Sequence, residues 1–137
     1  MKRKLSAIAL FAMIVPAQAR AATLTPTEAT FLDQLVTAAM VLERRCTGYE
    51  VNGAGGVQLG ARLLGSTEAA MAMMDAYDAA IKALDGRSYD PGKFRPEVSA
   101  AAGQTSNRVR ADLIRNPNAA CAEYGETGVS RGLLRRY

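Results

Sequence analysis

Histidine and tryptophan are both absent from this sequence of 137 residues. Without histidine, the chain lacks the commonest general base, the usual partner of a serine or cysteine nucleophile, and the commonest metal ligand. Chemistry based on carboxylates or lysine remains open. We identify no catalytic, cofactor-binding or metal-ligating set of residues. The sequence therefore favours a protein that is not an enzyme and carries no cofactor.

Aromatic residues and long apolar runs are also scarce. Aromatic side chains make up 6% of the chain, so the core must be built mainly from Leu, Val, Ile, Met and Ala. As a helix, the apolar run at residues 5–15 would span about 16 Å, near half of a hydrocarbon core of about 30 Å. It follows the charged residues 2–4 and precedes small-x-small sequences that end at Ala19 and Ala21. This order predicts a secretory signal peptide over residues 1–21, cleaved after Ala19 or Ala21, and not a stable membrane anchor.

Net charge is small once the predicted signal peptide is removed. The chain holds 17 Lys and Arg against 13 Asp and Glu, and three or four of the cations lie in the signal peptide. The mature chain, residues 22–137, is then close to neutral, which excludes a global phosphate-binding field and a nucleic-acid partner. Its length suits a single domain. We expect this domain outside the cytoplasm, either in the periplasm or secreted.

Helical periodicity dominates the mature chain. Thr25 as N-cap, Pro26 at the first helical position and Glu28 in a capping box predict a helix that ends near Gly48. A second long helix is predicted to begin at Ser66-Thr67-Glu68 and to end at Gly86. The expected core stripes are Phe31, Leu35, Ala39, Leu42 and Cys46 on the first helix, widened by Leu32, Val36 and Met40, and Ala70, Met74, Tyr77, Ile81 and Leu84 on the second.

A third long helix is predicted to begin at Pro96 and to be interrupted at Asn116-Pro117. Its expected stripe is Val98, Ala102, Thr105, Val109 and Leu113. We interpret residues 49–56 as a loop, residues 57–64 as a short helix and residues 117–124 as further helical turns. The chain from about residue 126 is interpreted as a flexible tail, in which Leu133 and Leu134 are the residues that can dock on the body. No alternating strand pattern is convincing. The sequence therefore predicts an all-α single domain, a small bundle of three to five helices.

Three residue clusters have features of functional sites: the glycines Gly53, Gly55, Gly56, Gly60 and Gly65; the paired acids Asp75 and Asp78; and the methionines Met40, Met71, Met73 and Met74. The glycines resemble a phosphate loop, but no strand precedes them and no Gly-Lys-Ser/Thr follows, which favours a flexible inter-helix loop. The paired acids sit side by side on one helix face, not across a cleft as in a glycosidase, which favours surface acids. The methionines suit a peptide-binding surface or a soft-metal site, but helix core and rim is the preferred interpretation.

Cys46 and Cys121 are the only cysteines of the chain. Two cysteines in a small exported domain usually pair. Two thiolates without histidine would supply only half of a tetrahedral zinc site, and a redox pair is typically Cys-x-x-Cys. We therefore predict a structural disulfide between Cys46 and Cys121.

The segment Cys121-Ala122-Glu123-Tyr124-Gly125-Glu126-Thr127-Gly128, followed by Gly132-Leu133-Leu134, resembles the ending of an uncharacterised family of short exported alphaproteobacterial proteins. These proteins also carry an early cysteine after a first helix, as Cys46 does here. The resemblance implies no activity and adds no catalytic residue. In size, helicity and a single long-range disulfide the chain is also similar to periplasmic acid-stress chaperones of the HdeA type, by analogy only and without a shared motif.

Two functions are consistent with these observations. The first is a non-enzymatic periplasmic protein that binds another periplasmic protein, as an accessory subunit or chaperone-like factor. The second is a small enzyme or ligand binder that acts on cell-wall or small-molecule ligands through loop carboxylates such as Glu50 and Asp90. Alanine-rich helix faces also permit a dimer, but the sequence does not decide the oligomeric state.

Overall fold

The computed structural model describes residues 23–137, so the predicted signal peptide lies outside the described residues. The described chain folds into five helices and two short strands, and the prediction of a small helical bundle is confirmed. In chain order the elements are α1 (Pro26–Glu43), β1 (Tyr49–Val51), α2 (Gly55–Leu64), α3 (Thr67–Leu84), α4 (Pro96–Arg115), α5 (Pro117–Ser130) and β2 (Leu134–Arg136).

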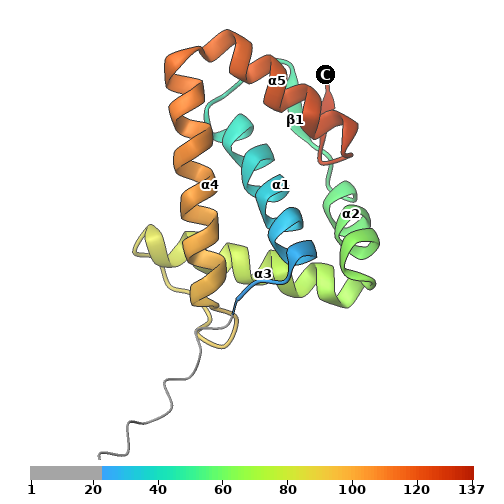
Figure 1. The fold of residues 1–137 in the computed structure, drawn as a ribbon, viewed down its shortest axis with the longest axis vertical. Coiled ribbons are helices and arrows are strands. Elements are labelled where there is room, and N and C mark those ends of the chain that lie inside the picture. The colour runs from blue at the N-terminus through green and yellow to red at the C-terminus, as the bar shows by residue number, and fades with distance from the viewer. Residues whose placement is uncertain (1–22) are drawn as a thin grey trace, which may run out of the picture.

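Helix α1 is the central element of the bundle (Figure 1). Helix α4 runs along one side of it, α2 lies on the other side, α3 crosses one end and α5 crosses the opposite end. None of the helices within residues 23–137 is long and apolar enough to cross a bilayer. Because all four of the other helices contact α1, the central helix is buried on more than one side.

The start of α1 follows from its first residues. The Glu28 backbone N–H donates to the Thr25 hydroxyl at 3.2 Å, and the Thr25 N–H donates to the Glu28 carboxylate at 3.3 Å. Pro26 occupies the first turn, where its missing N–H has no helical partner to lose. The capping box predicted from the sequence is confirmed.

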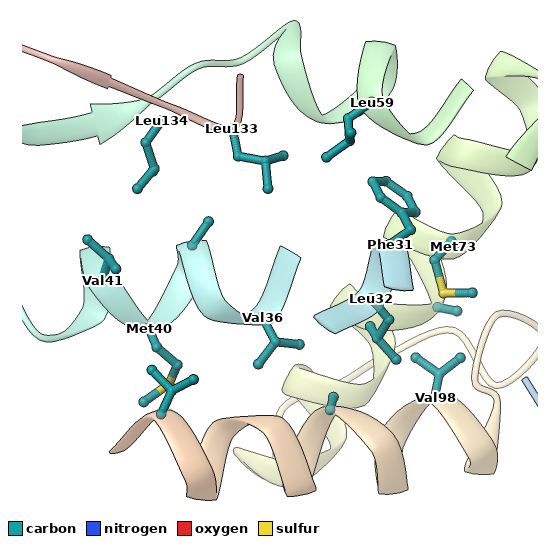
Figure 2. Close-up of a cluster of buried hydrophobic side chains, with 14 of the residues drawn as sticks. Phe31, Leu32, Val36, Met40, Val41, Leu59, Met73, Val98, Leu133 and Leu134 are labelled. Atoms are coloured by element: carbon teal, nitrogen blue, oxygen red, sulfur yellow. The ribbon is translucent and has the colours of Figure 1, made fainter. Parts of the chain in front are cut away.

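The core surrounds α1 (Figure 2). Phe31 and Val41 are fully buried on the side of α1 that faces Leu59, Leu133 and Leu134 of other elements. Val36 lies on the side of α1 that faces α4. Helix α4 contributes the stripe predicted from its sequence, and all five of its members are buried: Val98, Ala102, Thr105, Val109 and Leu113.

The glycines before and inside α2 allow close packing, which corrects the expected flexible loop. Helix α2 begins at Gly55, within the segment 49–56 that the sequence suggested to be a loop. A Cβ at Gly60 would lie 2.6 Å from Ala70 Cβ and 2.6 Å from Phe31 Cζ. Because no side chain fits at that spacing, glycine lets α2 approach α1 and α3 closely.

The C-terminal segment is ordered, which corrects the flexible tail expected from about residue 126. Helix α5 continues to Ser130, and β2 then pairs antiparallel with β1, with Val51 opposite Leu134. Leu133 and Leu134 are 5% and 2% exposed. The glycine-rich composition therefore reflects close packing of α5 against its neighbours and not flexibility.

A disulfide joins Cys46 to Cys121, as predicted, with the two Cα atoms 5.5 Å apart. Cys46 lies just after α1 and is 6% exposed, and Cys121 lies in the second turn of α5. The bond therefore fastens the end of the central helix to the helix that crosses it.

Candidate binding groove between α1 and α3

The apolar stripes predicted for α1 and α3 extend beyond the core, and the members that the core leaves half-buried locate the candidate site. Five members of the stripe predicted for α1 are buried as expected: Phe31, Leu32, Val36, Met40 and Cys46. Leu35, Ala39 and Leu42 are only half-buried, whereas Val41, which the stripe did not include, is 0% exposed. The stripe drawn from the sequence therefore lies partly outside the core.

Helix α3 shows the same displacement. Met74, Tyr77 and Ile81 are half-buried and Leu84 is 70% exposed. The residues that α3 buries are mostly small: Ala70, Met73, Ala76, Ala79 and Ala80. Because alanines bring the α3 backbone close to its neighbours, the larger side chains of the adjacent sector remain at the surface.

These displaced stripes meet in a cavity of about 280 Å³, the apolar pocket. Leu35 and Leu42 line it from α1, Met74 and Ile81 from α3, and Leu133 from the C-terminal segment. Val51, which is 61% exposed, stands at its edge.

The single charged side chain in the lining of the apolar pocket is Asp78. Its carboxylate is already paired with Lys82 Nζ at 2.7 Å, one helical turn away. The pocket therefore offers an occupant apolar contact and very little charge.

A second hollow, the three-helix groove, adjoins this pocket between α1, α3 and α4. Its volume is about 600 Å³. It shares Ala39, Tyr77 and Ile81 with the apolar pocket, so the two hollows are neighbours. Small residues make up much of its lining, and the larger members are Val36, Met40, Glu43, Leu84, Asp85 and Arg110.

Tyr77 lines both hollows. Burial raises the pKa of its hydroxyl to about 12, and the nearby Glu43 carboxylate adds to the shift. The hydroxyl is therefore neutral at ordinary pH and is no general base. Within residues 23–137 no side chain is hydrogen-bonded to it, so it can serve an occupant as a neutral donor.

The carboxylates considered for catalysis do not come together. Glu50 in β1 accepts from the Arg135 guanidinium at 2.7 Å, and Asp90 accepts from the Gly92 backbone N–H at 2.8 Å. Strand β1 and the α3–α4 connection that carries Asp90 lie at opposite ends of the bundle (Figure 1). Asp75 is paired with Lys93 at 3.5 Å. These acids therefore take part in surface ion pairs and turns.

The methionines do not form one site either. Met40 and Met73 are 3% and 1% exposed in the core, whereas Met71 is 53% exposed. Met74 alone reaches the apolar pocket. Among residues 23–137 no group of three or more cysteine or carboxylate side chains is placed to hold a metal ion.

Two polar clusters hold α1 and the start and middle of α4 together. Asp33 of α1 accepts from Thr105 Oγ1 at 3.0 Å and from the Arg108 guanidinium at 2.7 Å, which joins α1 to α4. Near the start of α1, burial alone would raise the pKa of Glu28, but hydrogen bonds from Arg95 and Thr25 outweigh it and lower the pKa. The Arg95–Glu28 separation is 2.9 Å. Both clusters contribute to positioning, and neither offers an unpaired reactive group.

No family model and no curated protein matches this chain, and no solved structure is similar to it. The function is therefore argued from the geometry of the apolar pocket and the three-helix groove.

Proposed function

We propose that this chain is an exported, non-enzymatic protein-binding domain that holds apolar side chains of a partner protein in the apolar pocket. The observation that supports this most strongly is the pair of displaced stripes. Helices α1 and α3 carry large apolar residues that the core does not bury, and these residues line one cavity. Exposed apolar surface of this kind marks interaction sites.

The dimensions and chemistry of the pocket favour a protein side chain over a small-molecule ligand. Its volume of about 280 Å³ is at the lower end of the roughly 300–1,000 Å³ of sites that enclose drug-sized molecules. Its one charged side chain is already paired. Leucine, isoleucine or phenylalanine side chains from an apolar segment of a partner would fit such a hollow as buried anchors.

The disulfide supports the proposed location. Such bonds persist in oxidising compartments, including the bacterial periplasm. A cross-link between Cys46 and Cys121 is consistent with export directed by the signal peptide predicted at residues 1–21. Membership of the exported two-cysteine family suggested by the C-terminal sequence remains part of the same proposal.

The test compares two exposed apolar residues, one at the pocket and one away from it. Val51 at the pocket edge and Ile114 on α4 are 61% and 65% exposed, so neither replacement removes core packing. Native protein, Val51→Glu and Ile114→Glu are immobilised and incubated with periplasmic extract of the native host. We expect native protein and Ile114→Glu to retain the same stoichiometric protein and Val51→Glu to lose it, because a carboxylate at the edge opposes apolar docking.

Equal retention by Val51→Glu would overturn the proposal, and so would the absence of any stoichiometric protein. A small-molecule function predicts a different result. In that case ligands from the extract would raise the melting temperature of the native protein with no protein retained.

A further inference from the structure

The three-helix groove contains unfilled space beside Gly103 and an exposed apolar side chain, Leu84. Gly103 of α4 lines it, and a Cβ placed there would have no atom within 4 Å. Leu84, at the end of α3, lines the same groove and is 70% exposed. The groove therefore presents both a hollow and an apolar knob on one face.

Two opposite charges line the groove without forming an ion pair with each other. Glu43 at the end of α1 forms no ion pair within residues 23–137, and the Arg110 guanidinium contacts only the neutral side-chain oxygen of Asn107, at 3.3 Å. Asp85, which lines the groove just after α3, differs from Glu43 because its carboxylate is paired with Arg87 at 3.3 Å.

We propose that the three-helix groove is the interface of a two-fold dimer, in which Glu43 of each copy pairs with Arg110 of the other and Leu84 of each copy enters the other groove. A two-fold axis brings the same face of both molecules together, so a contact from Glu43 to Arg110 is automatically repeated in reverse. One acid and one base on a single face are the minimum that makes this face complementary to itself.

The second copy fits this groove better than an unrelated protein does. An unrelated partner would have to supply a cation, an anion and an apolar knob in matching positions, whereas this chain already carries all three on the groove. The dimer does not rest on the proposed function, because it uses residues outside the apolar pocket. The two hollows share Ala39, Tyr77 and Ile81, so the variants below leave those three residues unchanged.

The test is charge reversal followed by mixing. Sedimentation velocity is recorded over a concentration series for the purified native chain with its disulfide intact, for Glu43→Arg and for Arg110→Glu. We expect the native chain to dimerise as concentration rises. Each single reversal places like charges opposite one another, which should weaken the dimer by more than about tenfold.

An equimolar mixture of Glu43→Arg and Arg110→Glu should dimerise again, because each contact across the axis then joins opposite charges. Leu84→Ser should weaken the native dimer, and Ile114→Ser, which alters an exposed residue outside the groove, should not. Matched controls are Glu123→Arg on α5 and Arg62→Glu on α2, both exposed positions outside the groove that should leave dimerisation unchanged.

A native chain that stays monomeric at every soluble concentration would overturn the proposal and leave the groove to a different partner. Single reversals that dimerise as well as the native chain would also overturn it. So would a mixture that stays monomeric, because repulsion alone would then not explain the loss.

Discussion

Glycine has opposite consequences at two helical positions. Gly125 in α5 lies against the aromatic ring of Tyr49, and a Cβ there would collide with the ring. The same tyrosine donates a hydrogen bond to Glu126 at 2.8 Å, which fixes the ring in place. Gly103 in α4 has open space where its Cβ would be. One glycine is therefore required by packing, and the other only weakens its helix.

This difference predicts that replacing glycine by alanine changes the free energy of unfolding in opposite directions at the two positions. Gly125→Ala should lower the free energy of unfolding by about 1–3 kcal/mol, because the ring must move to admit the methyl group. Gly103→Ala should raise it by about 0.5–1 kcal/mol, because alanine restricts the unfolded chain and nothing opposes the methyl group. Urea unfolding at low protein concentration, where the chain is monomeric, measures both. A gain in stability from both substitutions would show that Tyr49 does not constrain Gly125.

At the scale of elements, sequence reasoning succeeded where a capping motif marks the start of a helix or where the core residues are themselves the most apolar at helical spacing. The start of α1 follows from Thr25, Pro26 and Glu28, and the buried face of α4 follows from the regular helical spacing of its mainly apolar stripe. The face of α3 was wrong because alanines, including Ala76 and Ala80, are what that helix buries. A prediction that favours large apolar side chains selects the neighbouring face of α3 instead, and the residues on that face line the apolar pocket and the three-helix groove. The candidate site was therefore visible in the sequence as excess apolar residues but was assigned to the core.

The strands were beyond prediction from the sequence. Each has three residues, too few for an alternating pattern, and the ion pair between Glu50 and Arg135 joins residues 85 positions apart. Pairing at that distance depends on where α1 and α5 place the two segments. The apparent flexibility of the C-terminal segment came from its local composition, which carries no information about this contact.

An anchored C-terminus predicts that Leu134 matters to stability. Leu134→Ala should reduce the free energy of unfolding by about 2–5 kcal/mol, the usual cost of emptying a buried leucine site. Tyr137→Ala is the matched control, because Tyr137 is 78% exposed, whereas Leu134 is 2% exposed. Its effect should stay within about 0.5 kcal/mol. Chemical denaturation compares the two variants, and a flexible tail would be indicated by equal, negligible effects.

For the whole molecule, the arrangement around α1 determines what is held together and what is left open. The sheet and the Cys46–Cys121 bond both hold the C-terminal part of the chain against the residues that follow α1. Helix α3, in contrast, crosses one end of α1 (Figure 1). Residues of α1 and α3 line both the apolar pocket and the three-helix groove. Val51 and Leu134 of the sheet also line the apolar pocket, so the segment that the sheet and the disulfide secure forms one wall of the surface proposed for binding.

The disulfide should contribute a large part of the stability without deciding the fold. It joins residues with a sequence separation of 75, and restricting a loop of that length in the unfolded chain is worth about 4 kcal/mol in the chain-entropy description. Domains of this size have about 5–15 kcal/mol in total. A Cys46→Ser/Cys121→Ser double variant should therefore keep a helical circular dichroism spectrum at low temperature, because β2, Leu133 and Leu134 still anchor the C-terminus. Its melting temperature should fall by about 10 °C or more. Thiol titration of the unfolded, unreduced native chain provides the control, since two free thiols per molecule, or an unchanged melting temperature in the double variant, would contradict a stabilising cross-link.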